Sequence, residues 1–402
     1  MKDGYLIDSP APGRYLPVDS SVSAPVSKFY LPDDLPPELT LSDEVVAAYG
    51  RAMHSLGRLD GFWSEIPNPD IVLGLFIYKE AEQSSQVEGT RVTVTDMYRQ
   101  GISSKDVREA RNYAEALREA VNRLTAEGRS RTNVTNELLK TVHERLMEDG
   151  RTDDEDLRPG QFRSGFAWIE EDTGSLGTQI RFVPPKAEVA VRKMEDFERY
   201  VRSVGRYPDL MDIAILHYQF ETLHPFADGN GRVGRLLIVL LLIATDILVY
   251  PLFYLSSYIN RNRSAYTDSL LAVNEDGAWN DWLLFFLDGI REQADDGFSR
   301  AKLLIGLRES YRSRFGDTSP SVRALADAVF VEPVFTVSRA AELIDMTYPA
   351  ANKAIDELVS EGVLEETTGK QRYREFAAVD VLELLDRPSD DIPSPARLLS
   401  EK

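Results

Sequence analysis

The chain has 402 residues, which is more than one ordinary domain holds, so two or three folding units are expected. Hydrophobic residues make up 43% and charged residues 28%, as in globular proteins, and a formal net charge of −20 argues against broad binding to nucleic acids or anionic membranes. The sequence contains no cysteine, which excludes disulfides, thiol catalysis and zinc–thiolate sites.

The N-terminal residues 1–38 are rich in proline and serine and predict an extended arm over the surface. No basic segment followed by an apolar run begins the sequence, so no signal peptide is expected and the cytoplasm is the expected location. Apolar residues spaced three and four apart predict a mainly α fold with helices at 41–57, 70–88, 104–127, 132–148, 186–204, 209–223, 232–246, 262–274 and 278–314.

The helix expected at 70–88 carries Ser84 and Glu88 four residues apart on one face, and Gly89 follows as a C-terminal stop. A carboxylate in the last turn meets the negative end of the helix dipole, at a cost of about 0.3–1 kcal/mol. An ordered Glu88 therefore needs a cationic partner, and the alternative is a solvated glutamate. Further on, residues 159–185 predict two short strands around a turn at Asp172-Thr173-Gly174, a hairpin.

The loop between the helices expected at 209–223 and 232–246 has the sequence His224-Pro225-Phe226-Ala227-Asp228-Gly229-Asn230-Gly231-Arg232-Val233-Gly234-Arg235. Pro225 cannot continue the first helix, so the loop opens at His224. The second helix is expected to begin near Arg232 and to point its unpaired amides, with the positive end of its dipole, at the loop. An anion is expected there.

The residue types of this loop favour a polyphosphate with its metal. Gly229 and Gly231 allow the backbone to turn its N–H groups inward, and Asn230 can add a side-chain donor. Asp228 is the loop's carboxylate, which fits Mg²⁺ because this ion takes one or two protein carboxylates besides water and phosphate. The guanidinium forks of Arg232 and Arg235 share one helical face and match phosphate oxygens. An unperturbed histidine has a pKa of about 6.5, near neutrality, so His224 is the natural general base.

Two other features have plainer interpretations. His217, in the preceding helix, is expected to be structural. The apolar run 236–255 has the length of a membrane span, but Asp246 and Pro251 interrupt it, so a buried central helix and no membrane partner are predicted.

The loop resembles the signature of the Fic family of AMP transferases, His-x-Phe-x-Asp/Glu-Gly-Asn-Gly-Arg-x-x-Arg, at every specified position. The resemblance implies a helical core that binds ATP with Mg²⁺, transfers AMP to a Ser, Thr or Tyr hydroxyl of a protein and releases pyrophosphate. By position it implies His224 as the base, Asp228 as the Mg²⁺ ligand, Gly229, Asn230 and Gly231 as the anion cradle, Arg232 and Arg235 on the outer phosphates, and Phe226 as the anchor of the loop.

Three other segments also resemble parts of Fic proteins. The sequence Ser84-x-x-x-Glu88-Gly89 is similar to the family's inhibitory motif, which implies that Glu88 pairs with Arg235 and blocks the γ-phosphate. The hairpin resembles the flap that binds a target segment by strand addition, with Ile180, Arg181 and Phe182 as the expected docking residues. The helix at 262–274 resembles the one whose Tyr and Asn line the adenine pocket, here Tyr266 and Asn274.

From about residue 320 the pattern changes to short helices at 321–330, 335–343 and 348–358, followed by a strand pair around Thr368-Gly369-Lys370. This looks like the winged helix-turn-helix domain often appended to Fic cores. Its second helix could read DNA. However, residues 347–360 carry one lysine against Asp356 and Glu357, and basic residues occur only in the wing (Lys370, Arg372 and Arg374), so docking to a protein or to a second copy is favoured.

The expected organisation is an arm with the inhibitory segment (1–100), a Fic catalytic core (101–290), a linker helix (291–319), a winged-helix domain (320–386) and a tail (387–402). The leading hypothesis is an autoinhibited protein adenylyltransferase that uses ATP and Mg²⁺ and modifies target proteins and itself. The alternative is a nucleotide-sensing transcriptional regulator that binds DNA through the winged helix. The reverse reaction, removal of AMP with Glu88 orienting a water, also stays open.

Overall fold

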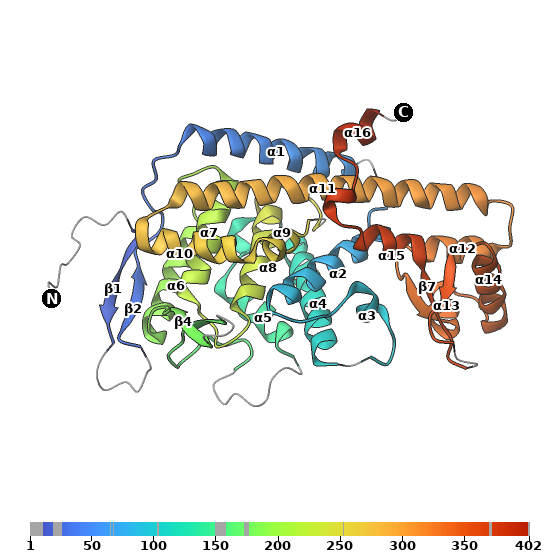
Figure 1. Cartoon of the computed structure of the whole chain (residues 1–402), viewed down its shortest axis with the longest axis horizontal. Helices are drawn as coiled ribbons and strands as arrows, with labels where there is room; N and C mark the ends of the chain where they lie inside the picture. The colour runs from blue at the N-terminus through green and yellow to red at the C-terminus, as the bar shows by residue number, and fades with distance from the viewer. Residues whose placement is uncertain are drawn as a thin grey trace. The chain divides into compact units, whose positions relative to one another are not determined.

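Figure 1 shows a computed structural model of the chain. It describes residues 11–18, 26–64, 66, 68–102, 104–148, 158–172, 177–251, 253–369 and 372–400. Helices dominate these residues, and the strands form two two-stranded sheets and one three-stranded sheet. The prediction of a mainly α fold is therefore confirmed.

From the N-terminus to the signature loop, the chain forms β1 (Gly13–Pro17), β2 (Lys28–Pro32), α1 (Asp43–Ser64), α2 (Asp70–Val87), α3 (Val94–Tyr98), α4 (Lys105–Ala126), η1 (Arg131–Asn133), α5 (Asn136–Leu146), β3 (Ile169–Asp172), β4 (Thr178–Phe182), α6 (Ala187–Val201) and α7 (Asp209–Leu223). After the loop follow α8 (Asn230–Ala244), α9 (Leu255–Arg261), α10 (Arg263–Asp276), α11 (Trp279–Arg314), α12 (Pro320–Ala328), β5 (Val334–Thr336), α13 (Val337–Leu343), α14 (Tyr348–Ser360), β6 (Leu364–Glu366), β7 (Glu375–Ala378), α15 (Val379–Asp386), η3 (Ser389–Asp391) and α16 (Pro395–Ser400).

The chain divides into two compact units. Unit 1 contains Met1–His54, Glu115–Val249 and Tyr258–Arg291, and unit 2 contains Ser55–Ala114, Tyr250–Ser257 and Glu292–Lys402. Four of the five boundaries fall inside helices α1, α4, α9 and α11, and the fifth, between Val249 and Tyr250, lies between α8 and α9. The five segments expected from the sequence stay predictions.

The centre of unit 1 is the pair α7 and α8, which pack against each other on either side of the loop (Figure 1). Both helices are rich in apolar residues and are buried almost throughout, as expected of central helices. Gly234 permits their close approach, because a Cβ there would lie 2.2 Å from Oε1 of Glu221 and 3.2 Å from the ring of Phe220. In the described part of the chain, none of the helices has the length and hydropathy that a membrane crossing requires.

Two local predictions for unit 1 were wrong. The proline-rich arm contains an antiparallel hairpin of β1 and β2, in which Tyr30 is fully buried and its ring lies 5.8 Å from that of Phe182. Residues 1–10 and 19–25 of the arm lie outside the described residues. The helix expected at 132–148 is interrupted before α5, because Thr135 caps α5 by accepting a hydrogen bond from the N–H of Leu138 (3.1 Å).

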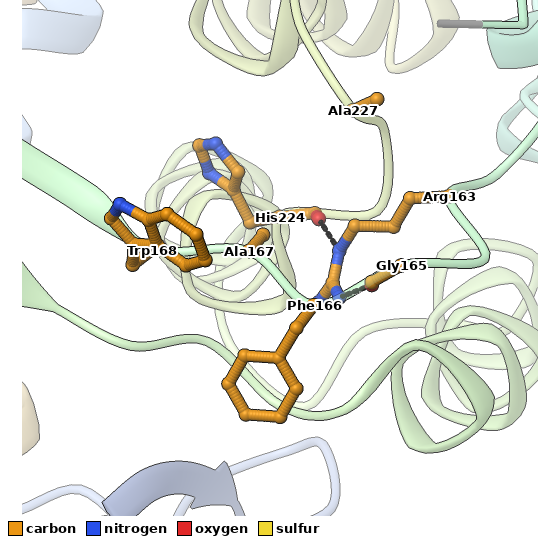
Figure 2. Close-up of a pocket in the computed structure, with 7 residues that line it drawn as sticks. All are labelled: Arg163, Gly165, Phe166, Ala167, Trp168, His224 and Ala227. Atoms are coloured by element: carbon orange, nitrogen blue, oxygen red, sulfur yellow. Dashed lines mark hydrogen bonds between the residues drawn. The ribbon is translucent and has the colours of Figure 1, made fainter. Parts of the chain in front are cut away.

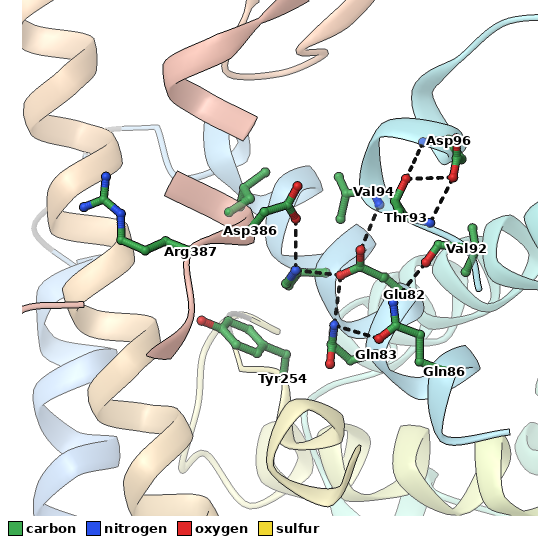
Figure 3. Close-up of polar contacts among 12 residues, drawn as sticks. Glu82, Gln83, Gln86, Val92, Thr93, Val94, Asp96, Tyr254, Asp386 and Arg387 are labelled. Carbon is green, nitrogen blue, oxygen red and sulfur yellow. Dashed lines mark hydrogen bonds and ion pairs between the residues drawn. The ribbon is translucent and has the colours of Figure 1, made fainter. Parts of the chain in front are cut away.

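Unit 2 contains α2, and buried charges on this helix bind other parts of the unit (Figure 3). Lys79 pairs with Glu82 at 2.6 Å and with Asp386, at the end of α15, at 3.2 Å. Glu82 also accepts a hydrogen bond from the N–H of Val94, the first residue of α3 (3.1 Å). The helix that ends at the expected inhibitory motif is therefore tied to both α3 and α15.

The C-terminal part of unit 2 runs helix, strand, two helices, two strands, and its sheet has the order β5-β7-β6. The three helices and the strand pair occur where the sequence predicts them, and β5, α15 and α16 are additional. Lys370 of the expected wing lies outside the described residues. The element order is the one a helix-turn-helix with a wing requires, and the winged-helix assignment stays a prediction.

Candidate active site

The loop begins at His224, which caps the C-terminus of α7 in the left-handed backbone region, with φ 47° and ψ 60°. Its N–H donates to the carbonyl of Phe220 at 3.0 Å, which is the last bond of the helix. For a residue with a side chain this conformation costs about 1–2 kcal/mol. Such strain persists only where neighbouring groups hold it, and it is concentrated at functional sites.

A side chain within the loop closes it. The Asn230 Oδ1 accepts from the N–H of Phe226 at 2.8 Å, and its Nδ2 donates to the carbonyl of the same residue at 2.9 Å. Phe226 is fully buried, in agreement with its expected role as the anchor. The buried Asn230 amide thus braces the loop backbone, and its expected contact with an anion stays a prediction.

The expected anion cradle lies where α8 begins. Gly229 is the N-cap with φ 76°, and a Cβ on it would lie 3.2 Å from Sδ of Met147. The helix starts at Asn230, two residues earlier than predicted, so the amides of its first turn, including that of Gly231, belong to the loop. N–H groups of a first turn have no acceptor within their own helix, which suits an anion.

The two signature arginines are buried on α8. Arg232 is 4% exposed and Arg235 is 2% exposed. Two guanidinium groups at the positive end of a helix dipole, in a region of low solvent access, raise the local positive potential. The site therefore favours a highly charged anion such as a triphosphate.

Asp228 contributes a carboxylate that is 37% exposed. Its Oδ1 accepts from the N–H of Gly229 at 2.6 Å and lies 3.7 Å from Nη2 of Arg232. Within the described ranges, no group of three or more His, Cys, Asp or Glu side chains could hold a metal. One accessible carboxylate fits Mg²⁺ bound mainly by water and phosphate oxygens, and does not fit an ion that needs a protein cage.

A pocket of about 200 Å³ opens beside the imidazole of His224 (Figure 2). Phe166 and the 38% exposed Trp168 give it apolar walls, and the guanidinium of Arg163 lies among its lining groups. It is lined by Arg163, Gly165, Phe166, Ala167, Trp168, His224 and Ala227. A substrate group can thus reach the histidine from outside the loop.

The two residues expected in the adenine pocket lie in the interior of unit 1. Tyr266 is 5% exposed, and its hydroxyl lies 2.8 Å from Nε2 of His217. Nδ1 of His217 lies 3.1 Å from the carbonyl of Gly234, so this ring links α8 to α10, in line with the structural role expected for it. Asn274 is 4% exposed and accepts from the hydroxyl of Tyr218. These contacts favour a supporting role, and an adenine contact by Tyr266 or Asn274 stays a prediction.

The predicted hairpin is present as β3 and β4, which pair antiparallel, although Thr173 and Gly174 of its turn lie outside the described residues. Of the expected docking residues, Ile180 is 36% exposed and Phe182 is buried. Arg181 pairs with Glu171 at 2.6 Å and with Asp268. Along the described residues β4 pairs with β3, and directly after β4 the carbonyl of Val183 accepts from the N–H of Tyr30 in β2 at 2.8 Å.

The expected inhibitory motif has the predicted local structure. Helix α2 ends at Val87, Glu88 is its exposed C-cap, and Gly89 follows with φ 91°. Ser84 is fully buried. Glu88 belongs to unit 2 and Arg235 to unit 1, so their pairing stays a prediction.

Two residues that contact the loop were not identified as site residues from the sequence. The Arg163 guanidinium donates to the carbonyl of His224 at 2.7 Å, and the His143 ring stacks on Phe226 with centroids 4.0 Å apart. His143 lies on the buried face of α5. That burial is the only signal that could have pointed to it, because a polar residue on an apolar helix face needs a partner.

Comparison with known proteins finds one family in two segments of the chain. A model of the Fic/DOC family N-terminal region matches residues 46–122, and a model of the Fic/DOC family matches residues 133–242. The crystal structure of a Fic family protein from Desulfovibrio desulfuricans is 20% identical to this chain, covers 85% of it and 98% of its own chain, and has a TM-score of 0.54, which shows the fold.

Two curated relatives match shorter segments. The probable protein adenylyltransferase aq_aa38 of Aquifex aeolicus is 30% identical over 95 residues, 24% of this chain and 30% of that protein. The protein adenylyltransferase Fic of Nematostella vectensis is 25% identical over 172 residues, 40% of this chain and 36% of that protein. The chain thus spans well under half the length of either relative. With both family matches and the shared fold, the chain carries the N-terminal and core domains of the Fic/DOC family.

Proposed function

We propose that the protein is an adenylyltransferase that transfers AMP from ATP to a hydroxyl side chain of a protein. The observation that carries this proposal is the loop itself: a strained histidine beside an open pocket, followed by a helix start with two buried arginines. The names of the two relatives, both called protein adenylyltransferases, support the same reaction class.

The proposed chemistry assigns one task to each part of the loop. His224 accepts the proton of the target hydroxyl, whose oxygen attacks the α-phosphorus of ATP. The bond from that phosphorus to the bridging oxygen breaks, and pyrophosphate leaves with the negative charge. Arg232, Arg235 and the first-turn amides of α8 stabilise this charge. Asp228 would hold Mg²⁺, which when bound neutralises part of the phosphate charge.

The target is proposed to bind along the β3–β4 hairpin. An extended target segment adds to the edge of β4 through main-chain hydrogen bonds, with Ile180 as the exposed apolar contact. Because Phe182 is buried, it anchors the hairpin rather than the target. This placement brings a hydroxyl of the segment towards the pocket beside His224.

The C-terminal module is proposed to dock a protein, which includes a second copy of the chain. Its wing residue Arg374 donates to Asn352 at 2.9 Å and lies 3.9 Å from Asp356 and 3.8 Å from Glu366. A cation that is already paired in this way contributes little to the binding of a nucleic-acid phosphate backbone. Weak, salt-insensitive binding of a fluorescent DNA duplex would agree with protein docking, and tight salt-sensitive binding would favour the transcriptional regulator. The cytoplasm stays the proposed location.

The proposed brake is Glu88, which competes with ATP for Arg235. We expect Glu88→Gly to raise AMP transfer several-fold, because removal of the carboxylate frees the guanidinium for the γ-phosphate. We expect His224→Ala, with or without the first change, to lower transfer by at least about 100-fold. The measurement is intact mass after incubation with ATP and Mg²⁺, with a gain of one AMP on the chain or on a co-incubated protein.

The outcomes of this experiment separate the two parts of the proposal. Absence of AMP addition in every variant would remove the transferase. Equal transfer with and without Glu88 would remove the brake and leave the transferase. Loss of a preloaded AMP group, faster with Glu88 present than with glycine, would show the reverse reaction.

A further inference from the structure

We propose that Arg163 and His143, which lie outside the signature loop, are positioning residues that give the loop its active shape. Arg163 holds the backbone of His224, and His143 holds the backbone of Asp228. The inference rests on the proposed function for the identity of the reaction. The geometry of the loop is independent of it.

Arg163 binds the start of the loop through both its side chain and its main chain. Its Nε donates to the carbonyl of His224 at 2.7 Å, and its main-chain N–H donates to the carbonyl of Pro225 at 2.8 Å. Its Nη2 donates to the carbonyls of Leu223 at 3.4 Å and Pro185 at 2.5 Å. Its Nη1 donates to the carbonyl of Gly165 at 2.9 Å, and Figure 2 shows this bond beside the one to His224. One residue thus engages three consecutive carbonyls, from Leu223 to Pro225.

These contacts explain how the strained histidine is held. The last carbonyls of a helix have no donor within the helix, and the C-terminal end of α7 carries partial negative charge. The Arg163 guanidinium is 5% exposed and, among the described residues, its hydrogen-bond acceptors are all carbonyl oxygens. Since these hydrogen bonds all go to carbonyl oxygens, the buried cation serves the backbone geometry, while the carboxylate of Glu188 attracts it through space without a hydrogen bond among the described contacts.

His143 binds the middle of the loop. Its Nδ1 accepts from the N–H of Gly160 at 3.0 Å, so the ring proton is on Nε2, which donates to the carbonyl of Asp228 at 3.1 Å. Its ring lies parallel to that of Phe226, at 6° and 4.0 Å. The side chain is fully buried on α5. It therefore fixes both the anchor of the loop and the peptide that carries the proposed Mg²⁺ ligand.

The two contacts predict two different defects. Loosening the His224 backbone misplaces the base but leaves the arginines and first-turn amides in place, so the rate at saturating ATP falls while ATP binding is kept. Loosening the Asp228 peptide displaces the carboxylate that is proposed to hold Mg²⁺, so ATP binds more weakly in the presence of Mg²⁺. A merely structural role for both residues predicts one common loss of stability instead.

The Arg163 experiment compares Arg163→Lys with Arg131→Lys. Lysine keeps the charge but cannot reach the set of carbonyls that a fork spans. Arg131 is a matched control, because it binds Asp212 at 3.0 Å and the carbonyl of Val201 at 2.9 Å, at the other end of α7. We expect Arg163→Lys to lower the AMP transfer rate at saturating ATP by about 10- to 100-fold, with the calorimetric Kd for ATP and Mg²⁺ nearly unchanged. The control should keep the natural rate.

The His143 experiment compares two substitutions. His143→Phe keeps the stack on Phe226 and removes both hydrogen bonds, whereas His143→Gln keeps an amide donor for the Asp228 carbonyl. We expect the first to raise the Kd for ATP in the presence of Mg²⁺ by about tenfold, and much less in its absence. The second should recover most of the affinity. Calorimetry reads this effect without catalysis.

Defined outcomes would overturn the inference. If the activity losses of Arg163→Lys and Arg131→Lys are both in proportion to their losses in Tm, the role of Arg163 is structural only. Natural activity in Arg163→Lys would also rule out a positioning role. Equal ATP affinity in His143→Phe, with and without Mg²⁺, would remove the role of His143. If no variant transfers AMP but ATP binding follows the expected pattern, the proposed reaction fails while the role of His143 stands. The role of Arg163 is then tested by the imidazole NMR signals of His224. Unchanged signals in Arg163→Lys would show that Arg163 does not position His224.

Discussion

At the scale of single residues, His217 shows how a buried histidine links the helix that follows the loop to its neighbour. His217 is fully buried between Gly234 of α8 and Tyr266 of α10. Burial, opposed by the Gly234 hydrogen bond and assisted by the nearby Arg235, lowers the pKa of His217 from 6.5 to about 3. The ring is therefore neutral at physiological pH and acts as a hydrogen-bonding link rather than as a charge.

This pKa predicts a dependence of stability on pH. In the unfolded chain His217 takes up a proton as the pH falls below 6.5, whereas in the folded chain it stays neutral to about pH 3. The unfolded state then binds more protons, so its free energy falls relative to the folded state as the medium becomes acidic. We expect this group to lower the free energy of unfolding by about 2 kcal/mol between pH 7 and pH 5.

Urea unfolding at the two pH values tests this expectation. His217→Gln keeps an amide that can bind Gly234 or Tyr266 but has no proton to gain. The substituted chain should lose about 2 kcal/mol less on acidification than the natural chain. The same loss in both chains would mean that the ring already titrates in the folded state.

At the scale of elements, the close pairing of α7 and α8 sets the distance between the base and the arginines. Gly234 makes this pairing possible, because it faces Glu221 and Phe220 of α7. Helix propensity alone would favour alanine at such a position. The absence of a side chain is therefore a packing requirement.

We expect Gly234→Ala to destabilise the protein by about 1–3 kcal/mol, because its Cβ would lie 3.2 Å from the Phe220 ring and force the helices apart. Gly50→Ala in α1 is the control: a Cβ there meets nothing within 4 Å, so alanine should stabilise the helix by about 0.5–1 kcal/mol. Urea unfolding measures both. Stabilisation by both changes would show that α8 tolerates the extra methyl group.

Elements were predicted best where the pattern is local. Helices α7 and α11 match their predicted ranges to within one residue at each end, because their apolar repeats continue to the ends of the helices. The β1–β2 hairpin was missed, since the propensity of Phe29 and Tyr30 for strands was outweighed by proline and serine around them. Its register depends on packing against other segments, which a short stretch of sequence does not encode.

At the scale of the whole molecule, unit 2 is held together by a buried cation on the long helix α11. Arg300 is 3% exposed, pairs with Asp296 at 2.8 Å and donates to Tyr254 at 2.8 Å. Its Nη groups also donate to the carbonyl of Arg387 at 2.7 Å and to that of Leu384, which satisfies the end of α15. One side chain therefore links α11 to the C-terminal module.

We expect Arg300→Ala to destabilise unit 2 by about 3–5 kcal/mol, because Asp296 would remain as a buried charge without its partner. Hydrogen exchange should rise in α15 and the nearby part of α11, and remain at the natural rate in α7 and α8. Arg199→Ala is the control, since its pair with Asp196 is 74% exposed on the arginine side and contributes little. Equal exchange in the two variants would mean that the link contributes nothing to unit 2.

The sequence by itself determined the helical class, the positions of most helices and the chemistry of the loop, because periodicity is local and the twelve residues from 224 to 235 are contiguous. Only the tertiary structure decided that Arg163 and His143 hold this loop, that Asn230 braces it, and that Tyr266 and Asn274 lie in the interior. The contacts of Arg163 and His143 join residues about 60 to 85 positions apart. A polar residue on an apolar helix face indicates that it has a partner, but which residue that partner is depends on how the helices pack in three dimensions.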